Sequence, residues 1–129
     1  MPRTAVHFYS DKRGDVPVLL WLRDLRRANR RAYGKCVATI QELGDRGHEL
    51  RRPVADYLQD GIYELRVRVA RENYRILYFY HGRQVAILAH AATEEAAILR
   101  SDLARALSRK VVFEADPVAH THEEEIQNG

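Results

Sequence analysis

Three β-type runs follow one another closely in the second half of the chain, at residues 62–69, 74–80 and 84–93. The first, IYELRVRV, alternates apolar and polar residues with the period of two that a half-buried strand requires. The connections at 70–73 and 81–83 are too short for a crossover between parallel neighbours, which needs a dozen or more residues. The runs therefore predict an antiparallel three-strand meander.

Other periodic segments flank the meander. An apolar and aromatic run at 4–9 predicts a first strand. A helix follows it, with Asp15 as its expected cap and Pro17 in its first turn, and Asn29 marks the turn to a second helix over 30–43. A last helix is expected over about 98–113, because leucines and a valine recur there at every fourth residue.

These elements predict one α+β domain: an N-terminal strand, an α-helical hairpin, the antiparallel meander (about four strands in all) and a C-terminal helix. We expect all three helices to pack on one face of the sheet. The domain should span residues 1–113, which leaves 114–129 as an acidic tail that is loosely held or docks as one short turn. A length of 129 residues fits one domain and not two.

A single cysteine, Cys36, excludes a disulfide framework within the chain and fits a reducing compartment. No apolar run reaches the ~20 residues of a membrane span, and the first residues lack the apolar core of a signal peptide. We therefore expect a cytoplasmic protein that does not bind membranes.

The formal net charge of +3 conceals an uneven distribution. Residues 1–93 carry a balance of +7 and residues 94–129 a balance of −4. Of the 21 basic residues, 18 are arginine, which suits a surface that binds phosphate, because the guanidinium group is planar and always charged. A GC-rich genome, which favours arginine codons, explains the same composition equally well.

Four arginines fall around the first hairpin of the meander. Arg66 and Arg68 occupy the polar face of the first run, Arg71 lies in the connection, and Arg75 is the second residue of the next run. Like charges that face one another across strands repel. With only Glu64 and Glu72 nearby to offset them, four arginines are unfavourable unless an anion binds there. The cluster is either a phosphate-binding site or a set of solubilising groups on a wet face.

Further residues could extend such a site. Arg51 and Arg52 precede the sheet, and nearby tyrosines could stack on bases, although core packing is the commoner role of a tyrosine; these are Tyr57, Tyr63 and Tyr78. His90 could titrate near neutrality as an acid or base, or be a structural histidine at a strand end. The run from His120 to Glu125 superficially resembles a metal site, but solvated charge is the better interpretation, and no metal ligand is predicted.

Taken in order, the motifs of residues 50–93 resemble the RelE/ParE toxin superfamily, and within it the phage-derived HigB-like branch. The motifs are Leu50 to Pro53, Asp60-Gly61, Tyr63-Glu64-Leu65-Arg66, Tyr74-Arg75-Ile76-Leu77-Tyr78 and Leu88-Ala89-His90. The stretch from Asp102 to Ala106 and the late Pro117 look like the end of these proteins, so the resemblance covers most of the chain.

The resemblance implies a RelE-like fold and the toxin of a type II toxin-antitoxin pair. Such a toxin is an mRNA endoribonuclease that acts on ribosome-bound mRNA, with the RNA's own 2′-OH as nucleophile and with no metal or other cofactor. Its partners would be mRNA, the ribosome and a cognate antitoxin of helix-turn-helix type encoded beside it. The resemblance assigns Arg66 and Arg75 to catalysis, and Arg68, Arg71 and Tyr74 to RNA binding.

One position departs from that pattern. HigB-like proteins commonly carry basic residues after the third strand of the meander, where this chain has Thr93-Glu94-Glu95. The carboxylates invert the local field and should weaken the approach of phosphate. Either Glu94 or His90 serves as general base, or catalysis is reduced or lost. The alternative is therefore a non-nucleolytic module on the same scaffold, an antitoxin-binding regulator or a gyrase-type inhibitor; an unrelated RNA-binding protein with this fold is a third reading.

Overall fold

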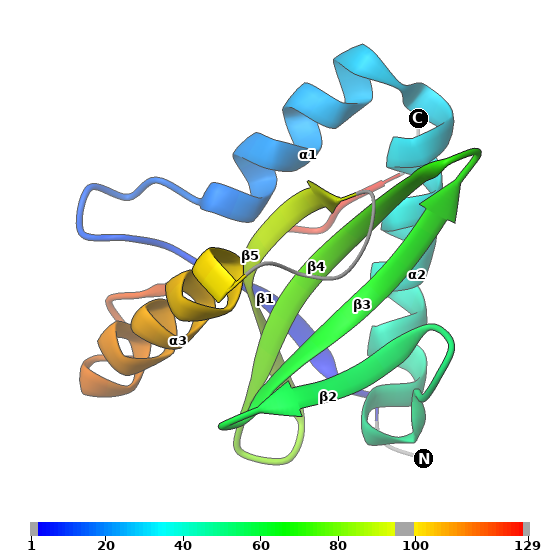
Figure 1. Cartoon of the computed structure of the whole chain (residues 1–129). Helices are drawn as coiled ribbons and strands as arrows, with labels where there is room; N and C mark the ends of the chain where they lie inside the picture. The colour runs from blue at the N-terminus through cyan, green and yellow to red at the C-terminus, as the bar shows by residue number, and fades with distance from the viewer. Residues whose placement is uncertain (1–2, 95–99, 128–129) are drawn as a thin grey trace.

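The computed structural model describes residues 3–94 and 100–127, and these form three helices, one short 3-10 helix and six strands (Figure 1). The mixed α+β class predicted from the sequence is confirmed. In chain order the elements are β1 Ala5–Tyr9, α1 Pro17–Ala28, α2 Arg30–Arg46, η1 Gly47–Glu49, β2 Ala55–Gln59, β3 Ile62–Val69, β4 Glu72–His81, β5 Val85–Glu94, α3 Arg100–Ala115 and β6 Thr121–His122.

All six strands belong to one sheet with the order β2-β3-β4-β5-β1-β6. The meander β3-β4-β5 is antiparallel as predicted, but β1 pairs with β5 in parallel, so the sheet is mixed. Two strands were not predicted. The segment 55–59 follows Pro53 and has no clear alternation, and β6 has only two residues, which is too short for any periodicity.

The helices cover both faces of the sheet, and the expectation that they share one face is wrong. One apolar core joins α1 and α2 to side chains such as Leu65, Ile76 and Leu88. A second core joins α3, through Ala106 and Phe113, to strand residues on the opposite face. In Figure 1, α3 lies in front of the sheet and α2 lies behind it. The sequence already indicates that both faces of β4 are covered, because residues 76–79 form a continuous apolar and aromatic run, and all four are buried in the structure.

The helix ends show which polar side chains act as caps. Asp15 does not cap α1, contrary to the prediction: its N-cap is Val16, which makes no side-chain cap bond. The carboxylate of Asp11 instead accepts a hydrogen bond from the Asp15 backbone N–H at 3.0 Å, inside the preceding loop. Asn29 caps α2, because its side chain accepts from the backbone N–H of Ala32 at 3.0 Å.

The acidic tail is docked along the sheet, and not merely as one turn. β6 pairs with β1 through Phe8 and Tyr9. Further along, Ile126 packs against the core of α1 and α2, and the Tyr33 hydroxyl donates to the backbone oxygen of Gln127 at 3.0 Å. None of the helices in the described part of the chain is both long and apolar enough to cross a membrane.

Candidate functional site

The β3-β4 hairpin brings the predicted arginines together. A two-residue turn, Ala70–Arg71, joins the strands, and their register places Arg66 directly opposite Arg75 and Arg68 opposite Asn73. Side chains directly opposite one another across two strands point to the same side. Arg66, Arg68 and Arg75 therefore share the face of the sheet on which α3 packs, and we call this group the arginine face.

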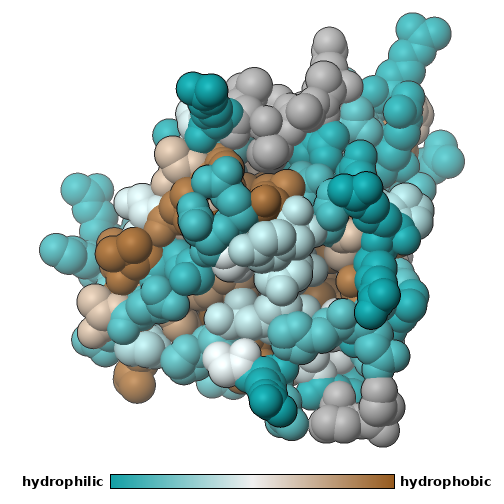
Figure 2. All heavy atoms as spheres, turned by 60° about the horizontal axis from the view of Figure 1, so that its bottom comes forward, coloured by the Kyte–Doolittle hydropathy of each residue, from teal (hydrophilic) through white to brown (hydrophobic). Residues whose placement is uncertain are grey.

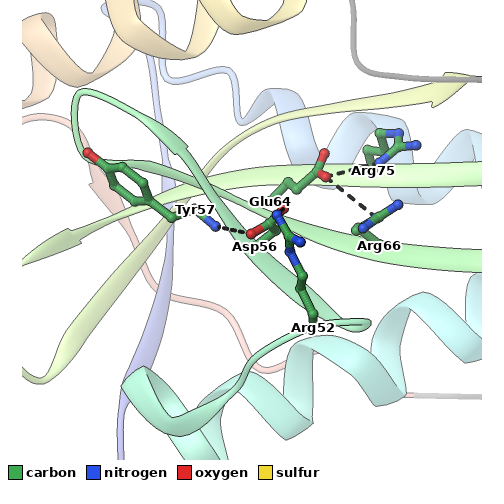
Figure 3. Close-up of polar contacts among 6 residues, drawn as sticks. All are labelled: Arg52, Asp56, Tyr57, Glu64, Arg66 and Arg75. Atoms are coloured by element: carbon green, nitrogen blue, oxygen red, sulfur yellow. Dashed lines mark hydrogen bonds and ion pairs between the residues drawn. The ribbon is translucent and has the colours of Figure 1, made fainter.

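A buried carboxylate joins two of these arginines (Figure 3). Glu64 Oε1 accepts a hydrogen bond from Arg75 Nη1 at 3.0 Å and forms an ion pair with Arg66 Nε at 3.6 Å. Glu64 is 4% exposed and Arg75 7%, whereas the Arg66 side chain is 42% exposed. The expected repulsion between the arginines is thus offset inside the protein. Burial of Glu64 excludes a solubilising role for this residue, and the two guanidinium groups allow its carboxylate to be buried.

A second ion pair continues the network onto β2. Arg52 Nη2 lies 3.0 Å from Asp56 Oδ2, and Asp56 pairs in register with Glu64. The hydrogen bond from Arg52 lowers the pKa of Asp56, and the charge of Arg66 lowers it further. Three arginines and two carboxylates therefore form one network, in which Arg52 comes from the segment before β2 and the other four residues from β2, β3 and β4. Asp56 was not predicted from the sequence, because only the pairing of β2 with β3 brings it opposite Glu64.

The remaining predicted arginines are exposed. The side chain of Arg68 donates a weak hydrogen bond from Nε to the backbone oxygen of Ala70 at 3.3 Å, and Arg71 is exposed in the hairpin turn. A cavity of about 480 Å³ lies beside the second half of β3, which has no pairing with β2, and Arg66, Arg68 and Arg75 form part of its lining. Arg51 lines a different hollow, next to Tyr57. An anion that approaches from solvent would contact the exposed arginines before it could contact the buried Arg75.

His90 is held between β5 and α3. Its Nδ1 lies 3.2 Å from Arg109 Nη1 and its Nε2 lies 2.7 Å from Asp102 Oδ1. A guanidinium group can only donate, so Nδ1 accepts and Nε2 carries the proton. Burial lowers the pKa of His90, and the bond to Asp102 opposes this only in part. Both ring nitrogens are therefore engaged in fixing α3 to the sheet, and the geometry supports the structural alternative for His90 over the catalytic one.

Tyr74 is not part of the arginine face. Successive side chains of a strand point to opposite sides, so Tyr74 and Arg75 separate. Tyr74 is 4% exposed in the core of α1 and α2, where it meets Trp21 edge to face at 6.2 Å. The backbone of Glu94 pairs with Asn73 at the end of β5. The side chain of Glu94, and all of Glu95, lie outside the described residues.

The histidines of the tail serve the fold. His120 is buried, stacks on Tyr9 at 5.7 Å and contacts the backbone oxygen of Ser10 through Nδ1 at 2.8 Å. His122 pairs with Glu124 at 3.1 Å. Within residues 3–94 and 100–127 no group of three or more His, Cys, Asp and Glu side chains is placed to hold a metal ion.

The fold and the site define a small α+β protein in which arginines cluster on one face of the sheet. Residues 21–110 match the family model described as phage-derived protein Gp49-like (DUF891), and the chain belongs to this family. The family is related to RelE/ParE-type toxins, which agrees with the resemblance seen in the sequence and fits a toxin of a toxin-antitoxin pair. The match begins within α1, ends within α3 and includes the whole arginine face. A search of curated proteins finds none that matches the chain.

Proposed function

We propose that this protein is a HigB-like toxin of a type II toxin-antitoxin pair and an endoribonuclease that cuts ribosome-bound mRNA. The observation that carries the proposal is the pairing of Arg66 with Arg75 across β3 and β4, beside the exposed Arg68. Guanidinium groups bind phosphate in bidentate fashion and remain charged at every physiological pH. The relation of the Gp49-like family to RelE/ParE-type toxins supports the same class.

The reaction needs orientation and charge neutralisation more than it needs a protein nucleophile. The 2′-oxygen of the RNA forms a bond to the adjacent phosphorus while the bond to the 5′-oxygen breaks. The 2′-OH proton passes to a base and the leaving oxygen gains a proton. Arg66 would bind a non-bridging oxygen, where negative charge grows in the transition state. Arg75, which is buried, would add positive charge near the same phosphate without direct contact. Arg68 and Arg71 would bind neighbouring phosphates.

The proton acceptor in this proposal is Glu94. His90, the other residue considered for that role, has both ring nitrogens engaged by Asp102 and Arg109. The backbone of Glu94 shares a row of the sheet with Asn73 and Arg68, and this row is separated from the row of Arg66 and Arg75 by one intervening row. Glu94→Gln should therefore lower the cleavage rate and leave RNA affinity unchanged or slightly increased.

Mapping new mRNA 5′ ends after induction in cells tests the function. We expect growth arrest with cleavage inside translated messages. Arg66→Ala should abolish cleavage, whereas Arg31→Ala, which removes an exposed arginine from α2, should not. Arg75→Lys keeps the buried charge and tests the same site without leaving Glu64 unpaired. Toxicity with intact mRNA, or full cleavage by Arg66→Ala, would contradict the proposal.

A non-nucleolytic binding module is the second candidate. The observation that favours it is the Glu64 carboxylate, which already neutralises charge between Arg66 and Arg75. A gyrase supercoiling assay run beside the 5′-end mapping separates the two functions. The neighbouring reading frame tests the antitoxin: we expect a short gene that encodes a helix-turn-helix protein.

A further inference from the structure

A second hollow lies outside the arginine face, between the segment that follows η1 and strand β2. Its volume is about 430 Å³. Figure 2 views the molecule with the lower end of Figure 1 brought forward; this face is mainly hydrophilic, with side chains of intermediate hydropathy across its middle. We call the hollow of about 430 Å³ the tyrosine hollow. Its lining includes His48, Arg51, Arg52, Asp56, Tyr57 and Tyr63.

Tyr57 presents a fixed aromatic ring beside this space. The residue is 52% exposed, so its ring is accessible to a ligand. The hydroxyl accepts a hydrogen bond from the Gly61 backbone N–H at 3.0 Å, and the ring meets Tyr63 edge to face at 5.0 Å. A ring anchored at its hydroxyl and packed on a neighbour loses little conformational freedom when a ligand binds.

The rings behind Tyr57 form a rigid support. Tyr63 stacks on Tyr78 at 5.4 Å and meets Tyr80 edge to face at 5.2 Å. His48 stacks on Tyr80 at 3.7 Å, and its Nε2 contacts the backbone oxygen of Arg83 at 3.1 Å. The wall of the hollow is therefore a fixed aromatic cluster, which suits a flat ligand better than a flexible aliphatic one.

The charges at the rim indicate an anionic ligand. Arg52 is paired with Asp56, and Arg51 is exposed, with no side-chain hydrogen bond or ion pair found in the described part of the chain. The backbone oxygen of Arg51 accepts hydrogen bonds from the N–H groups of Val54 and Ala55, both at 3.1 Å, so the base of this side chain is held in place. An unpaired cation beside an open aromatic ring is the combination that binds the phosphate and base of a nucleotide.

The tyrosine hollow lies across strand β2 from the arginine face, because Tyr57 is directly opposite Tyr63, whose ring packs against the core of α1 and α2. Asp56 lies between them: it pairs with Arg52 at the rim of the hollow, and the charge of Arg66 acts on its carboxylate from the other side. Tyr57 and Asp56 are neighbours on β2, so the edge of this strand separates the two surfaces. A single strand of RNA that contacts Arg66 would therefore cross the β2 edge of the sheet to reach Tyr57.

We propose that the tyrosine hollow binds an unstacked base of single-stranded RNA, in a nucleotide outside the cleaved bond, with the base on Tyr57 and its phosphate on Arg51. This subsite rests on the proposed function, because it needs the RNA to lie on the arginine face. It would select an unpaired nucleotide at a fixed distance from the cleavage point. Stacking of this type tolerates any base, so it adds affinity with little sequence preference.

The test uses the full chain and a 2′-O-methyl RNA oligonucleotide, which cannot be cleaved, with binding followed by fluorescence anisotropy. Loss of one stacked base corresponds to about a fivefold to hundredfold loss of affinity, and we expect this for Tyr57→Ala. Tyr57→Phe keeps the ring and should bind within about threefold of the unaltered protein. Arg51→Ala should weaken binding and reduce its salt dependence. Tyr33→Ala, on α2, is the matched control and should bind normally.

A second measurement does not depend on the stability of the variants. An oligonucleotide that carries 5-iodouridine should cross-link on irradiation to Tyr57, with the modified residue identified by mass spectrometry. Normal RNA affinity in Tyr57→Ala, or cross-links confined to other residues, would overturn the subsite, as would a Tyr57→Ala variant impaired only toward a protein partner. Failure of the proposed function looks different: the unaltered protein would then leave cleavable RNA intact, whatever the outcome at Tyr57.

Discussion

Replacement of Glu64 by glutamine isolates the role of the buried carboxylate that pairs with both Arg66 and Arg75. Glu64 and Arg75 are both nearly inaccessible, and their hydrogen bond is 3.0 Å long. Glu64→Gln keeps the shape of the side chain and removes its charge. The guanidinium of Arg75 then stays buried with less compensating negative charge, whereas the more exposed Arg66 can turn to water.

The size of the effect follows from this burial. Removal of one partner from a buried ion pair costs about 3–5 kcal/mol. The amide oxygen can still accept from Arg75, which reduces the cost, but Glu64 Oε2 is buried without a hydrogen-bond partner among the described residues, so an NH₂ group there would be an unsatisfied donor. We expect Glu64→Gln to lower the free energy of unfolding by about 2–3 kcal/mol and the melting temperature by roughly 10 °C.

Chemical denaturation of Glu64→Gln, Arg75→Met and the double variant gives a double-mutant cycle, in which the pair should show a coupling energy of about 1–3 kcal/mol. Asp56→Asn is the control from the same network, and because its partner Arg52 is exposed, the unfolding midpoint should barely move. The same variant gives a binding test: Glu64→Gln removes an anion that competes with phosphate for Arg66, so a non-cleavable RNA should bind more tightly. A loss of under 1 kcal/mol together with zero coupling would refute the reasoning.

Three further outcomes follow from the packing. Gly47 has φ +53° and an added Cβ would overlap the Thr4 hydroxyl, so Gly47→Ala should cost about 2–4 kcal/mol by urea denaturation, against about 1 kcal/mol for Gly82→Ala, which has φ +70° and open space. His90 has a pKa below its ordinary 6.5 in the folded protein, so stability is retained above pH 6.5 and falls as pH drops through the folded-state value; His90→Gln should flatten that part of the pH profile of melting temperature. Burial raises the pKa of the Cys36 thiol to about 12, so a thiol reagent should modify it only as fast as the protein unfolds, and modification at native rates typical of a free thiol would contradict this.

The sequence predicts the meander well because its signal is local. Strict alternation in 62–69 and short connections specify strand pairing without knowledge of the rest of the chain. The same local information places Arg66 and Arg75 in one cluster, since a hairpin of known register determines which side chains meet. These parts of the fold and site depend on neighbours within about 20 residues.

The parts that the sequence did not predict depend on distant contacts. The burial of Glu64 requires both guanidinium groups, and the choice of face for α3 depends on the second apolar surface of β4. His90 looked equally like a catalytic or a structural residue until α3 supplied Asp102 and Arg109 on either side of its ring. In each case the side chain could be exposed or buried as far as the local sequence shows, and only contacts with distant residues determine which.

The arginines of the β3-β4 hairpin differ in burial, and this difference predicts different roles in RNA binding. Arg68 and Arg71 are exposed and can attract and dock a phosphate backbone through long-range charge, an interaction that weakens as salt rises. Arg75 is fixed behind Glu64, so it adds little to attraction, but its position is set before any ligand arrives. Loss of Arg68 should therefore reduce the salt dependence of RNA binding, whereas Arg75→Lys should leave that salt dependence nearly unchanged and lower the cleavage rate. An equal effect of both variants on salt dependence would show that the two groups act as one.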